Sequence, residues 1–372
     1  MTPSTIVARA PGKLMLLGEY AVLEPGCEAL VVAVDRFVRV RIEPAAAPVL
    51  DCPDLGIVAL DGELRDGAIH WRGGDDPALA RKLAFVDQTL ALVLAAARRR
   101  GAEPPPFALT VESELGAGPD KAGLGSSASV ATAVAGAALA WCGGAAGSGA
   151  TGLSSRAIFQ VAALAHYLAQ GRKGSGADVA AAVTGGVVAY RNPGFDEVLA
   201  AGDAVAALAK PWPRLALTPL PWPEGHVVVA GATGAGASTT GLIARVDALH
   251  GEAAARYAAL REALGALAHD AAAEPSAPGW GRAMEAHQRA LERFESACSG
   301  GIGIVTPAIE RLIAIARARG APAKISGAGG GDSVIALVPR ADAPRLEETW
   351  RGAGAAVFTI DGPVAGVTIT RE

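Results

Sequence analysis

The sequence has little cysteine and no large excess of charge of either sign. Its 4 cysteines, among 372 residues, are scattered and form no Cys-x-x-Cys pair. This pattern supports neither a disulfide framework nor a zinc knuckle, and buried free thiols are expected. The net charge is −4 and no basic run dominates the chain, which argues against a nucleic-acid partner. The length is sufficient for two domains, each with its own core.

The sequence also lacks an obvious membrane-spanning or secretory segment. Its mean hydropathy is positive because alanine is abundant. The longest apolar candidate, Ser129–Cys142, is too short and too weakly apolar to span a bilayer. Residues Met1–Gly12 contain Pro3 and Pro11 and have no apolar signal-peptide core. We therefore expect a soluble, cytoplasmic protein with no membrane partner.

Glycine, by contrast, is abundant and clustered. Clusters of glycine mark three loops, at residues 12–26, 116–125 and 327–331, rather than a low-complexity linker. No Gly-x-x-x-x-Gly-Lys-Ser/Thr sequence is present, so none of these loops is a Walker phosphate loop. No internal repeat is visible.

Apolar periodicity predicts an α+β fold. In the first half, strands come early and helices later, which favours an α+β layer over a strict βαβ alternation. The predicted strands are Ile6–Ala10, Leu14–Leu17, Ala29–Val34, Arg36–Ile42, a hairpin over Val58–Ile69, Phe107–Glu112 and Gly185–Arg191. The predicted helices are Pro77–Arg99, a long helix after Ser126, Ser155–Gln170 and a short turn over Asp178–Val183.

A proline-rich run, Pro211–Pro223, marks the expected junction between two halves. Beyond it, the pattern predicts helices packed on a small antiparallel sheet. The predicted strands are Val227–Ala230, Ser333–Val338, Ala355–Ile360 and Val364–Thr370. The predicted helices are Ser238–Leu249, Glu252–Ala271, Trp280–Cys298 and one that begins at Thr306-Pro307 and ends at Gly320.

The second glycine loop runs into a helix and is a candidate phosphate site. Residues Gly123–Ala128 have the sequence GLGSSA, and an alanine-rich helical segment follows. Unpaired backbone N–H groups and the positive end of the helix dipole gather at such a helix start, which suits a phosphate. A plain loop with a capped core helix fits equally well, because Ser126, Ser127 and Ser129 are good caps. The stretch alone leaves both interpretations open.

Taken together, the three loops are more specific. Pro11–Tyr20 (PGKLMLLGEY), Gly123–Ala128 (GLGSSA) and Ser326–Asp332 (SGAGGGD) resemble, in order and separation, the three signature motifs of the GHMP small-molecule kinases. The resemblance spans nearly the whole chain. It implies a two-domain α+β fold, with a ribosomal-S5-domain-2-like N-terminal domain over residues 1–205 and a ferredoxin-like C-terminal domain, helices on an antiparallel sheet, over residues 206–372.

Within that family the chain is most similar to the phosphomevalonate kinases. The similar stretches are Gly18–Phe37, Lys121 just before the second loop, Gly174–Ala180, Ala237–Thr239 and Asp332. This similarity implies ATP and Mg²⁺ as cofactors and a small phosphorylated acceptor as substrate. It further implies a monomer or homodimer, with no nucleic-acid partner.

The alternative is a mevalonate kinase or another GHMP small-molecule kinase, and one position counts against the mevalonate kinases. They carry an acidic magnesium ligand eleven residues before the catalytic aspartate, where this chain has Tyr167. The departure leaves the metal ligands of this chain open. A second departure, Ala177 where phosphomevalonate kinases commonly have phenylalanine, alters the expected wall of the pocket.

The resemblance assigns roles to individual residues. It implies that Lys13 lies near the transferring phosphoryl group and Asp178 near the acceptor oxygen, as the catalytic pair. Without the motifs, the pair would be interpreted as a surface lysine and a helix-capping aspartate. The residues expected to hold the nucleotide are Lys121, Gly123, Leu124, Gly125, Ser126, Ser127 and Ala128, and the Ser127 hydroxyl is the expected Mg²⁺ ligand. The residues expected to contact the substrate are Glu19, Tyr20, Arg172, Lys173, Ser175, Gly176, Ser238, Gly327, Gly329 and Gly330.

A phosphorylated acceptor requires cations near its phosphate. Some of the basic residues beside the signature loops are expected to converge there: Lys121, Arg172, Lys173, Arg191 and Lys324. His166 follows a helical face and is expected to be a packed residue rather than a catalyst. A non-catalytic ligand sensor on the same scaffold would lack Lys13 or Asp178, and both are present.

Overall fold

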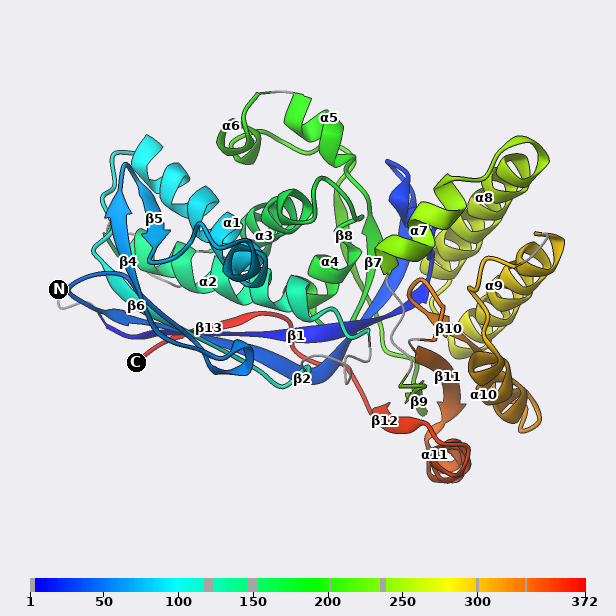
Figure 1. Cartoon of the computed structure of the whole chain (residues 1–372). Coiled ribbons are helices and arrows are strands. Elements are labelled where there is room, and N and C mark those ends of the chain that lie inside the picture. Colours follow the sequence, from blue (N-terminus) through cyan, green and yellow to red (C-terminus); the bar gives the residue numbers. More distant parts are fainter. Residues whose placement is uncertain are drawn as a thin grey trace.

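Two β-sheets organise the chain (Figure 1). The computed structural model describes residues 4–116, 123–145, 153–200, 202–234, 239–298, 301–331 and 333–372. The large sheet has the order β13-β1-β2-β6-β3-β4-β5, and β7 and β8 extend it from β2. Its strands are β1 (Ile6–Leu17), β2 (Glu28–Pro44), β3 (Val49–Cys52), β4 (Ile57–Arg65), β5 (Ala68–Trp71), β6 (Phe107–Ser113), β7 (Val187–Arg191), β8 (Ala216–Leu220) and β13 (Thr368–Arg371).

Helices cover one face of the large sheet (Figure 1). They are α1 (Pro77–Arg99), α2 (Ser126–Ala145), α3 (Ser155–Ala169) and α4 (Ala177–Thr184). Helix α2 lies at the centre of this layer, since it contacts the other three helices and the central strands β1 and β2. Its alanines are almost completely buried, and these small side chains let the helix pack closely on the sheet. The short elements at the edges are η1 (Ala21–Leu23), η2 (Pro53–Leu55), α5 (Phe195–Ala200) and α6 (Ala204–Leu208).

Helix α2 is longer than the sequence analysis assumed. It has 20 residues, and its window Ser126–Gly143 has a mean hydropathy of 1.2, so by length and composition it could cross a membrane. The prediction that this segment is too short for a span was therefore wrong. Yet 78% of the window is buried inside the protein, as in a core helix. Packing against the sheet accounts for its apolar composition.

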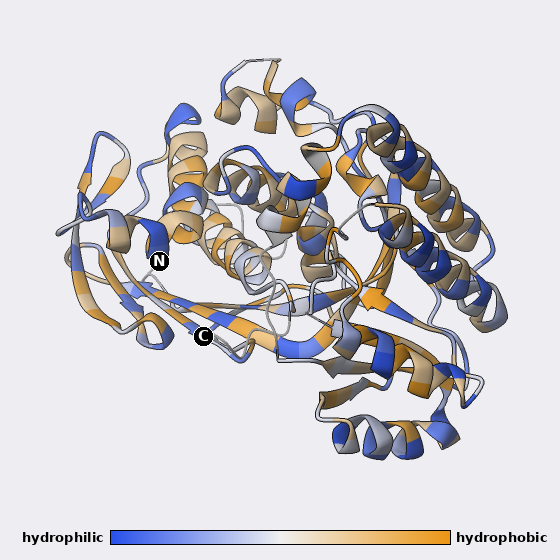
Figure 2. Cartoon of the chain, turned by 45° about the vertical axis from the view of Figure 1, so that its right-hand side comes forward, coloured by the Kyte–Doolittle hydropathy of each residue, from blue (hydrophilic) through white to orange (hydrophobic). Residues whose placement is uncertain are grey.

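The small sheet has the order β10-β11-β9-β12 and is antiparallel throughout. Figure 2 shows that its neighbouring long helices carry many hydrophilic residues, whereas apolar residues dominate the strands and helices of the large sheet. Its strands are β9 (His226–Ala232), β10 (Ala323–Ser326), β11 (Ser333–Pro339) and β12 (Ala356–Ile360). The accompanying helices are α7 (Thr239–Asp247), α8 (Gly251–Ala273), α9 (Ala277–Ala297), α10 (Pro307–Arg317), η5 (Arg340–Asp342) and α11 (Ala343–Gly352).

The expected α+β class, the main helices and the free cysteines are confirmed. Two pairs of predicted strands are in fact single long strands. Strand β1 continues through Pro11 and Gly12 because a shift in register there absorbs the irregularity. Strand β2 is continuous because it pairs with β1 along one edge and, along the other, first with β7 and then with β6.

Other differences concern short elements. The short elements β3, β10, α5, α6 and α11 were not predicted. The proline-rich run, expected to be a plain junction, contains β8. The strand expected at Val364–Thr370 is shorter and belongs to the large sheet, where Ile6–Arg9 of β1 pair with β13. The division into residues 1–205 and 206–372 stays a prediction.

Segment 364–366 reaches β13 by crossing the end of α4 with backbone against backbone. A Cβ on Gly366 would lie 2.2 Å from the carbonyl oxygen of Val183. The substitution Gly366→Ala should therefore lower the free energy of unfolding by about 1–3 kcal/mol through overpacking. Gly352→Ala is the matched control, since no atom lies within 4 Å of its added Cβ, and it should change stability by less than about 0.5 kcal/mol. Urea denaturation measures both, and equal stabilities would contradict the close approach.

Candidate active site

Lys13 and Asp178 lie side by side, although they are far apart in the sequence. Lys13 is within β1, and Asp178 is in the first turn of α4. The Lys13 Nζ lies 3.4 Å from Asp178 Oδ1 and donates a hydrogen bond to the carbonyl of Gly123 at 3.2 Å. The lysine side chain is only 8% exposed, whereas the aspartate side chain is 32% exposed. The ion pair therefore presents its carboxylate toward solvent while the ammonium is nearly enclosed.

The second glycine loop packs directly on this pair. The Lys13 N–H donates to the carbonyl of Leu124 at 2.9 Å, and the Ser129 hydroxyl donates to the carbonyl of Pro11 at 2.8 Å. A Cβ on Gly125 would lie 3.0 Å from the Lys13 side chain and 3.5 Å from Asp178 Oδ2. In the first turn of α2, the N–H groups of Ala128 and Ser129 donate to the carbonyl of Gly125 at 3.0 and 3.1 Å, so those of Ser126 and Ser127 are the ones that can bind a ligand beside the ion pair.

The Ser127 hydroxyl is held by a buried histidine. Its Oγ lies 3.0 Å from Nε2 of His166, whose ring stacks on Phe85. Burial lowers the pKa of His166 to about 4, while the charge of Asp178 acts in the opposite direction. The imidazole is therefore neutral at pH 7 and packed. Gln170 Nε2 also lies 2.7 Å from the same ring nitrogen, and a Ser127 hydroxyl that donates to this nitrogen keeps its oxygen lone pairs for another ligand.

The segment before Asp178 is fixed by aromatic side chains. The Tyr190 hydroxyl donates to the carbonyl of Ser175, and the Ser175 hydroxyl accepts from the N–H of Ala177 at 3.3 Å. Gly176, at φ +82°, precedes α4, and a Cβ there would lie 2.8 Å from the ring of Phe195. This loop therefore holds the first turn of α4, and with it Asp178, in one position.

The third glycine loop is joined to the first. The Met15 N–H donates to the Ser326 hydroxyl at 2.8 Å, and the Tyr20 hydroxyl donates to the carbonyl of Ala328. Gly327 donates its N–H to the Glu19 carboxylate at 3.3 Å. The loop also closes on the segment before α10: Gly330 N–H bonds to the carbonyl of Ile304, and a Cβ on Gly329 would lie 2.3 Å from that same oxygen.

The basic residues expected to converge on the acceptor phosphate differ in exposure and in their ion-pair partners. Lys324 is fully buried and its ammonium contacts Glu19, so it does not face solvent. Arg172, at φ +64°, is exposed and donates from Nε and Nη2 to Asp196 at 3.2 and 2.6 Å. Lys173 is exposed on the same loop. Arg191 pairs with Glu28, away from the ion pair.

Some predicted residues cannot be placed. Lys121 and Ser238 lie outside the described residues, as does Asp332. Within the described part of the chain, no group of three or more His, Cys, Asp or Glu side chains is arranged to hold a metal ion. Tyr167, which stands where mevalonate kinases have an acidic magnesium ligand, stacks its ring on Phe195 with the ring centroids 4.8 Å apart.

Two residues at the third loop were not anticipated from the sequence. His287 of α9 is completely buried with Nε2 3.0 Å from a Glu19 carboxylate oxygen, and Gln288 accepts the N–H of Ile325 at 3.0 Å. The apolar face of α9 was visible in the sequence. Neither side chain has a motif or spacing that indicates the contact, because the contact forms only when α9 packs on β10.

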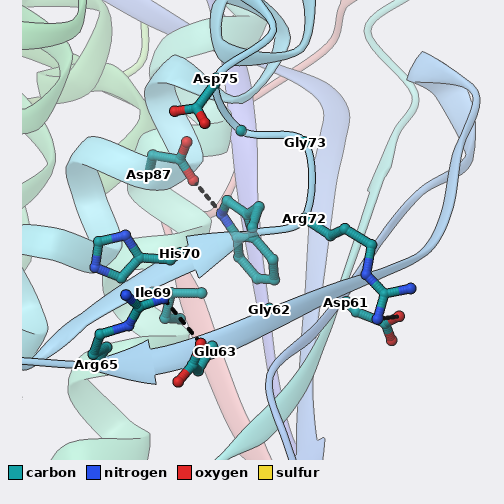
Figure 3. A pocket seen from close by; sticks show the side chains of 12 residues that line it. Asp61, Gly62, Glu63, Arg65, Ile69, His70, Arg72, Gly73, Asp75 and Asp87 are labelled. Atoms are coloured by element: carbon teal, nitrogen blue, oxygen red, sulfur yellow. Dashed lines mark hydrogen bonds and ion pairs between the residues drawn. The ribbon is translucent and has the colours of Figure 1, made fainter.

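A hollow of about 590 Å³ lies elsewhere, between the β4–β5 hairpin and α1 (Figure 3). There Trp71 Nε1 donates to Asp87 at 2.6 Å, and burial raises the pKa of Asp87 to about 6. The remaining lining carries both signs of charge, for example Glu63 and Arg72. None of the predicted site residues lines this hollow, so it is separate from the three joined loops.

Acidification should destabilise the protein through His166. Its pKa is about 4 in the folded chain and 6.5 ordinarily, so between these values the unfolded chain binds a proton that the folded chain does not. The stabilisation is thus present above about pH 6.5 and is lost as the pH falls toward 4. At about pH 5 we expect the wild type to lose about 2 kcal/mol more than His166→Gln, relative to pH 7. Urea denaturation of both proteins measures this difference, and equal losses would contradict it.

Two regions of the chain match the models of the N-terminal and C-terminal parts of one protein family. The N-terminal domain of the GHMP kinases matches residues 86–186, and the C-terminal region of the GHMP kinases matches residues 268–356. The chain is 34% identical over 378 residues to the phosphomevalonate kinase of Streptomyces sp. (strain CL190), covering 98% of both chains. It is 27% identical to the mevalonate kinase of Thermococcus onnurineus (strain NA1), covering 90% of this chain and 89% of that one.

The fold is likewise shared with solved structures. Streptococcus pneumoniae phosphomevalonate kinase, in complex with phosphomevalonate and AMPPNP, superposes with a TM-score of 0.76 at 22% identity, over 98% of this chain and 99% of that one. The expected two-domain GHMP kinase fold is therefore confirmed. With matches in both halves and 34% identity over almost its full length, the chain belongs to the GHMP kinases, a family of ATP-dependent small-molecule kinases.

Proposed function

We propose that the chain is a phosphomevalonate kinase. It transfers the γ-phosphoryl group of ATP to (R)-5-phosphomevalonate and yields 5-diphosphomevalonate and ADP, a step of the mevalonate pathway toward isoprenoids. The observation that carries the proposal is the 34% identity to a phosphomevalonate kinase over 98% of both chains. The juxtaposition of Lys13 and Asp178 beside the second glycine loop supports a kinase reaction at this place.

The proposed reaction depends on positioning and on neutralising charge. A phosphomonoester acceptor, with a second pKa of about 6, is already largely dianionic at neutral pH. Asp178 therefore orients the attacking oxygen more than it removes a proton. Lys13, whose ammonium is enclosed between Asp178 and the carbonyl of Gly123, offsets the negative charge of the transferring group.

The nucleotide phosphates are proposed to lie at the start of α2. The N–H groups of Ser126 and Ser127 would bind them, since those of Ala128 and Ser129 already donate to Gly125, and the glycine loop brings its backbone close to Lys13. The Ser127 oxygen fits a Mg²⁺ ligand because its hydroxyl proton can point to the neutral His166. Mg²⁺ held mainly by the ATP phosphates would neutralise charge on the transferred group, which is consistent with few protein ligands.

The acceptor phosphate is proposed to lie near the α3–α4 loop. Lys173 and Arg172 are the cations there, and Arg172 is oriented by its two hydrogen bonds to Asp196. The aromatic Tyr167 occupies the place of the acidic magnesium ligand of mevalonate kinases. This replacement removes a negative charge that would repel a phosphorylated acceptor.

Mevalonate kinase activity is the second candidate. The observation that favours it is the 27% sequence identity to the mevalonate kinase of Thermococcus onnurineus, over 90% of this chain. In that case Asp178 would serve as a general base, since a hydroxyl acceptor must lose its proton.

An acceptor screen separates the two candidates. ADP release is measured by a coupled assay with phosphomevalonate, mevalonate, homoserine and galactose at equal concentrations, with ATP and Mg²⁺ present. We expect kcat/KM for phosphomevalonate to exceed that for every other acceptor by at least about a hundredfold, because the others lack the phosphate that Arg172 and Lys173 would contact by charge-assisted hydrogen bonds. Turnover of mevalonate with none of phosphomevalonate would overturn the proposal.

Substitutions at the ion pair test the roles of its two members. Lys13→Met should lower kcat by about 10²–10³-fold, because it removes a cation aimed at developing charge. Asp178→Asn should lower kcat by a pH-independent factor above about pH 6 if the acceptor is a phosphate. A rate that rises steadily with pH in this variant would indicate a hydroxyl acceptor and a lost general base. Asp361→Asn, which alters an exposed ion pair of the C-terminal segment, is the control and should keep wild-type kcat.

A further inference from the structure

The outer edge of β10 is bonded by side chains instead of by another strand. β10 is the edge strand of the small sheet, and alternate N–H groups of an edge strand point away from the sheet. The N–H of Ala323 donates to the Glu285 carboxylate at 3.1 Å, and the N–H of Ile325 donates to Gln288 at 3.0 Å. Both acceptors come from α9.

The next N–H in this alternate series belongs to Gly327, the first glycine of the third loop. It donates at 3.3 Å to Glu19, which belongs to the first loop and not to α9. The row of acceptors along this edge thus passes from α9 to the first loop at the point where β10 ends and the glycine loop begins. The Glu19 carboxylate thus fixes the backbone of the third loop relative to the first loop.

This carboxylate is part of a buried group of three ionisable side chains. Glu19 is 2% exposed, and both His287 and Lys324 are 0% exposed. One Glu19 oxygen contacts the Lys324 ammonium, and the other lies 3.0 Å from His287 Nε2. Burial opposes ionisation of Glu19, but the charge of Lys324, and the His287 ring beside it, lower its pKa to about 2. Burial lowers the pKa of His287, so a carboxylate, an ammonium and a neutral imidazole share the site at pH 7.

Oε1 of Glu19 accepts from both the Lys324 ammonium and the Gly327 N–H, while Oε2 faces the His287 ring, so the carboxylate lies between the two loops. Two neighbouring hydrogen bonds also join the first loop to the third. Met15 N–H bonds to Ser326, and the Tyr20 hydroxyl bonds to the carbonyl of Ala328. Residues of β1 and of the turn after it thus hold three consecutive residues of the third loop.

We propose that Glu19 is a positioning residue: together with Lys324 and His287 it fixes the third glycine loop relative to the strand that carries Lys13. The inference rests on the proposed kinase function only in that the third loop takes part in the reaction. A neutral apolar trio could fill the same volume, but it would leave the Gly327 N–H without an acceptor. The charged group is thus required for the register of the loop and not only for filling the core.

Two variants separate positioning from a purely structural role. Glu19→Gln keeps an amide oxygen but leaves the Lys324 ammonium without a counter-charge. The double variant Glu19→Gln, Lys324→Met removes both charges and should recover thermal stability, because a buried ion pair replaced by neutral groups is often no less stable. Leu346→Ala, which truncates a buried side chain of α11, is the control for lost stability alone.

Three quantities are measured on the full-length protein: the melting temperature, kcat and KM for ATP and acceptor, and hydrogen exchange of the segment 323–331. We expect Glu19→Gln to lower kcat by about a hundredfold, the order of loss that follows a misplacement of about 1 Å. KM for ATP should stay within about twofold, since the second loop is untouched. Exchange in the segment 323–331 should accelerate. The double variant should recover its melting temperature but neither kcat nor slow exchange.

Recovery of kcat together with stability in the double variant would overturn the proposal, as would unchanged exchange of the segment 323–331 in either variant. If Glu19→Gln does not fold, the double variant decides alone. Leu346→Ala should melt earlier yet keep its kcat well below its melting temperature. If the wild type turns over no acceptor, the kinase proposal fails, while hydrogen exchange still decides whether Glu19 holds the loop.

Discussion

Strand β1 is crossed by other backbone segments at points where side chains have no room, and the arrangement of the site depends on this close approach. A Cβ on Gly12 would lie 2.8 Å from the carbonyl of Leu124, and one on Gly125 would press on Lys13. The second loop can therefore lie against the lysine only as bare backbone. This contact aims the start of α2 at the ion pair and leaves Asp178 as the part open to solvent. The glycines therefore determine where the second loop lies, and this placement determines which groups the charges of Lys13 and Asp178 can reach.

The two buried or half-buried ion pairs of the site differ in what surrounds them. Lys13 and Asp178 are separated by 3.4 Å, with the carboxylate partly exposed, so a ligand can compete for each partner. Glu19 and Lys324 are sealed from solvent, where an unpaired charge would cost several kcal/mol. The Lys13–Asp178 pair therefore suits a reaction in which charge develops on a ligand. The Glu19–Lys324 pair suits holding the first and third loops at a fixed distance.

Much of the fold and the composition of the site could be predicted from the sequence. Helix α1 was predicted with its observed bounds because its apolar period and its basic C-terminal end agree, and the structure adds an N-terminal cap by Asp76. The three glycine loops could be predicted as one site because their order matched a family pattern. What stayed hidden depends on contacts between distant segments. Lys324 gave no sign of its burial, since a lysine beside a glycine loop is usually solvated, and His287 gave none of its proximity to Glu19. Strand β13 was placed with its sequence neighbours because its partner, β1, is at the other end of the chain.

The pairing of β13 with β1 also bears on how the protein reaches its folded state during synthesis. Ile6 pairs with Arg371, so the contact joins segments separated by nearly all of the residues between them. Until residues 368–371 have left the ribosome, one edge of β1 has open N–H and C=O groups, and such an edge can pair with another chain. Long-range pairing of this kind also slows folding, because the loop that it closes is large. The strand that carries Lys13 is therefore synthesised long before the strand that completes its edge.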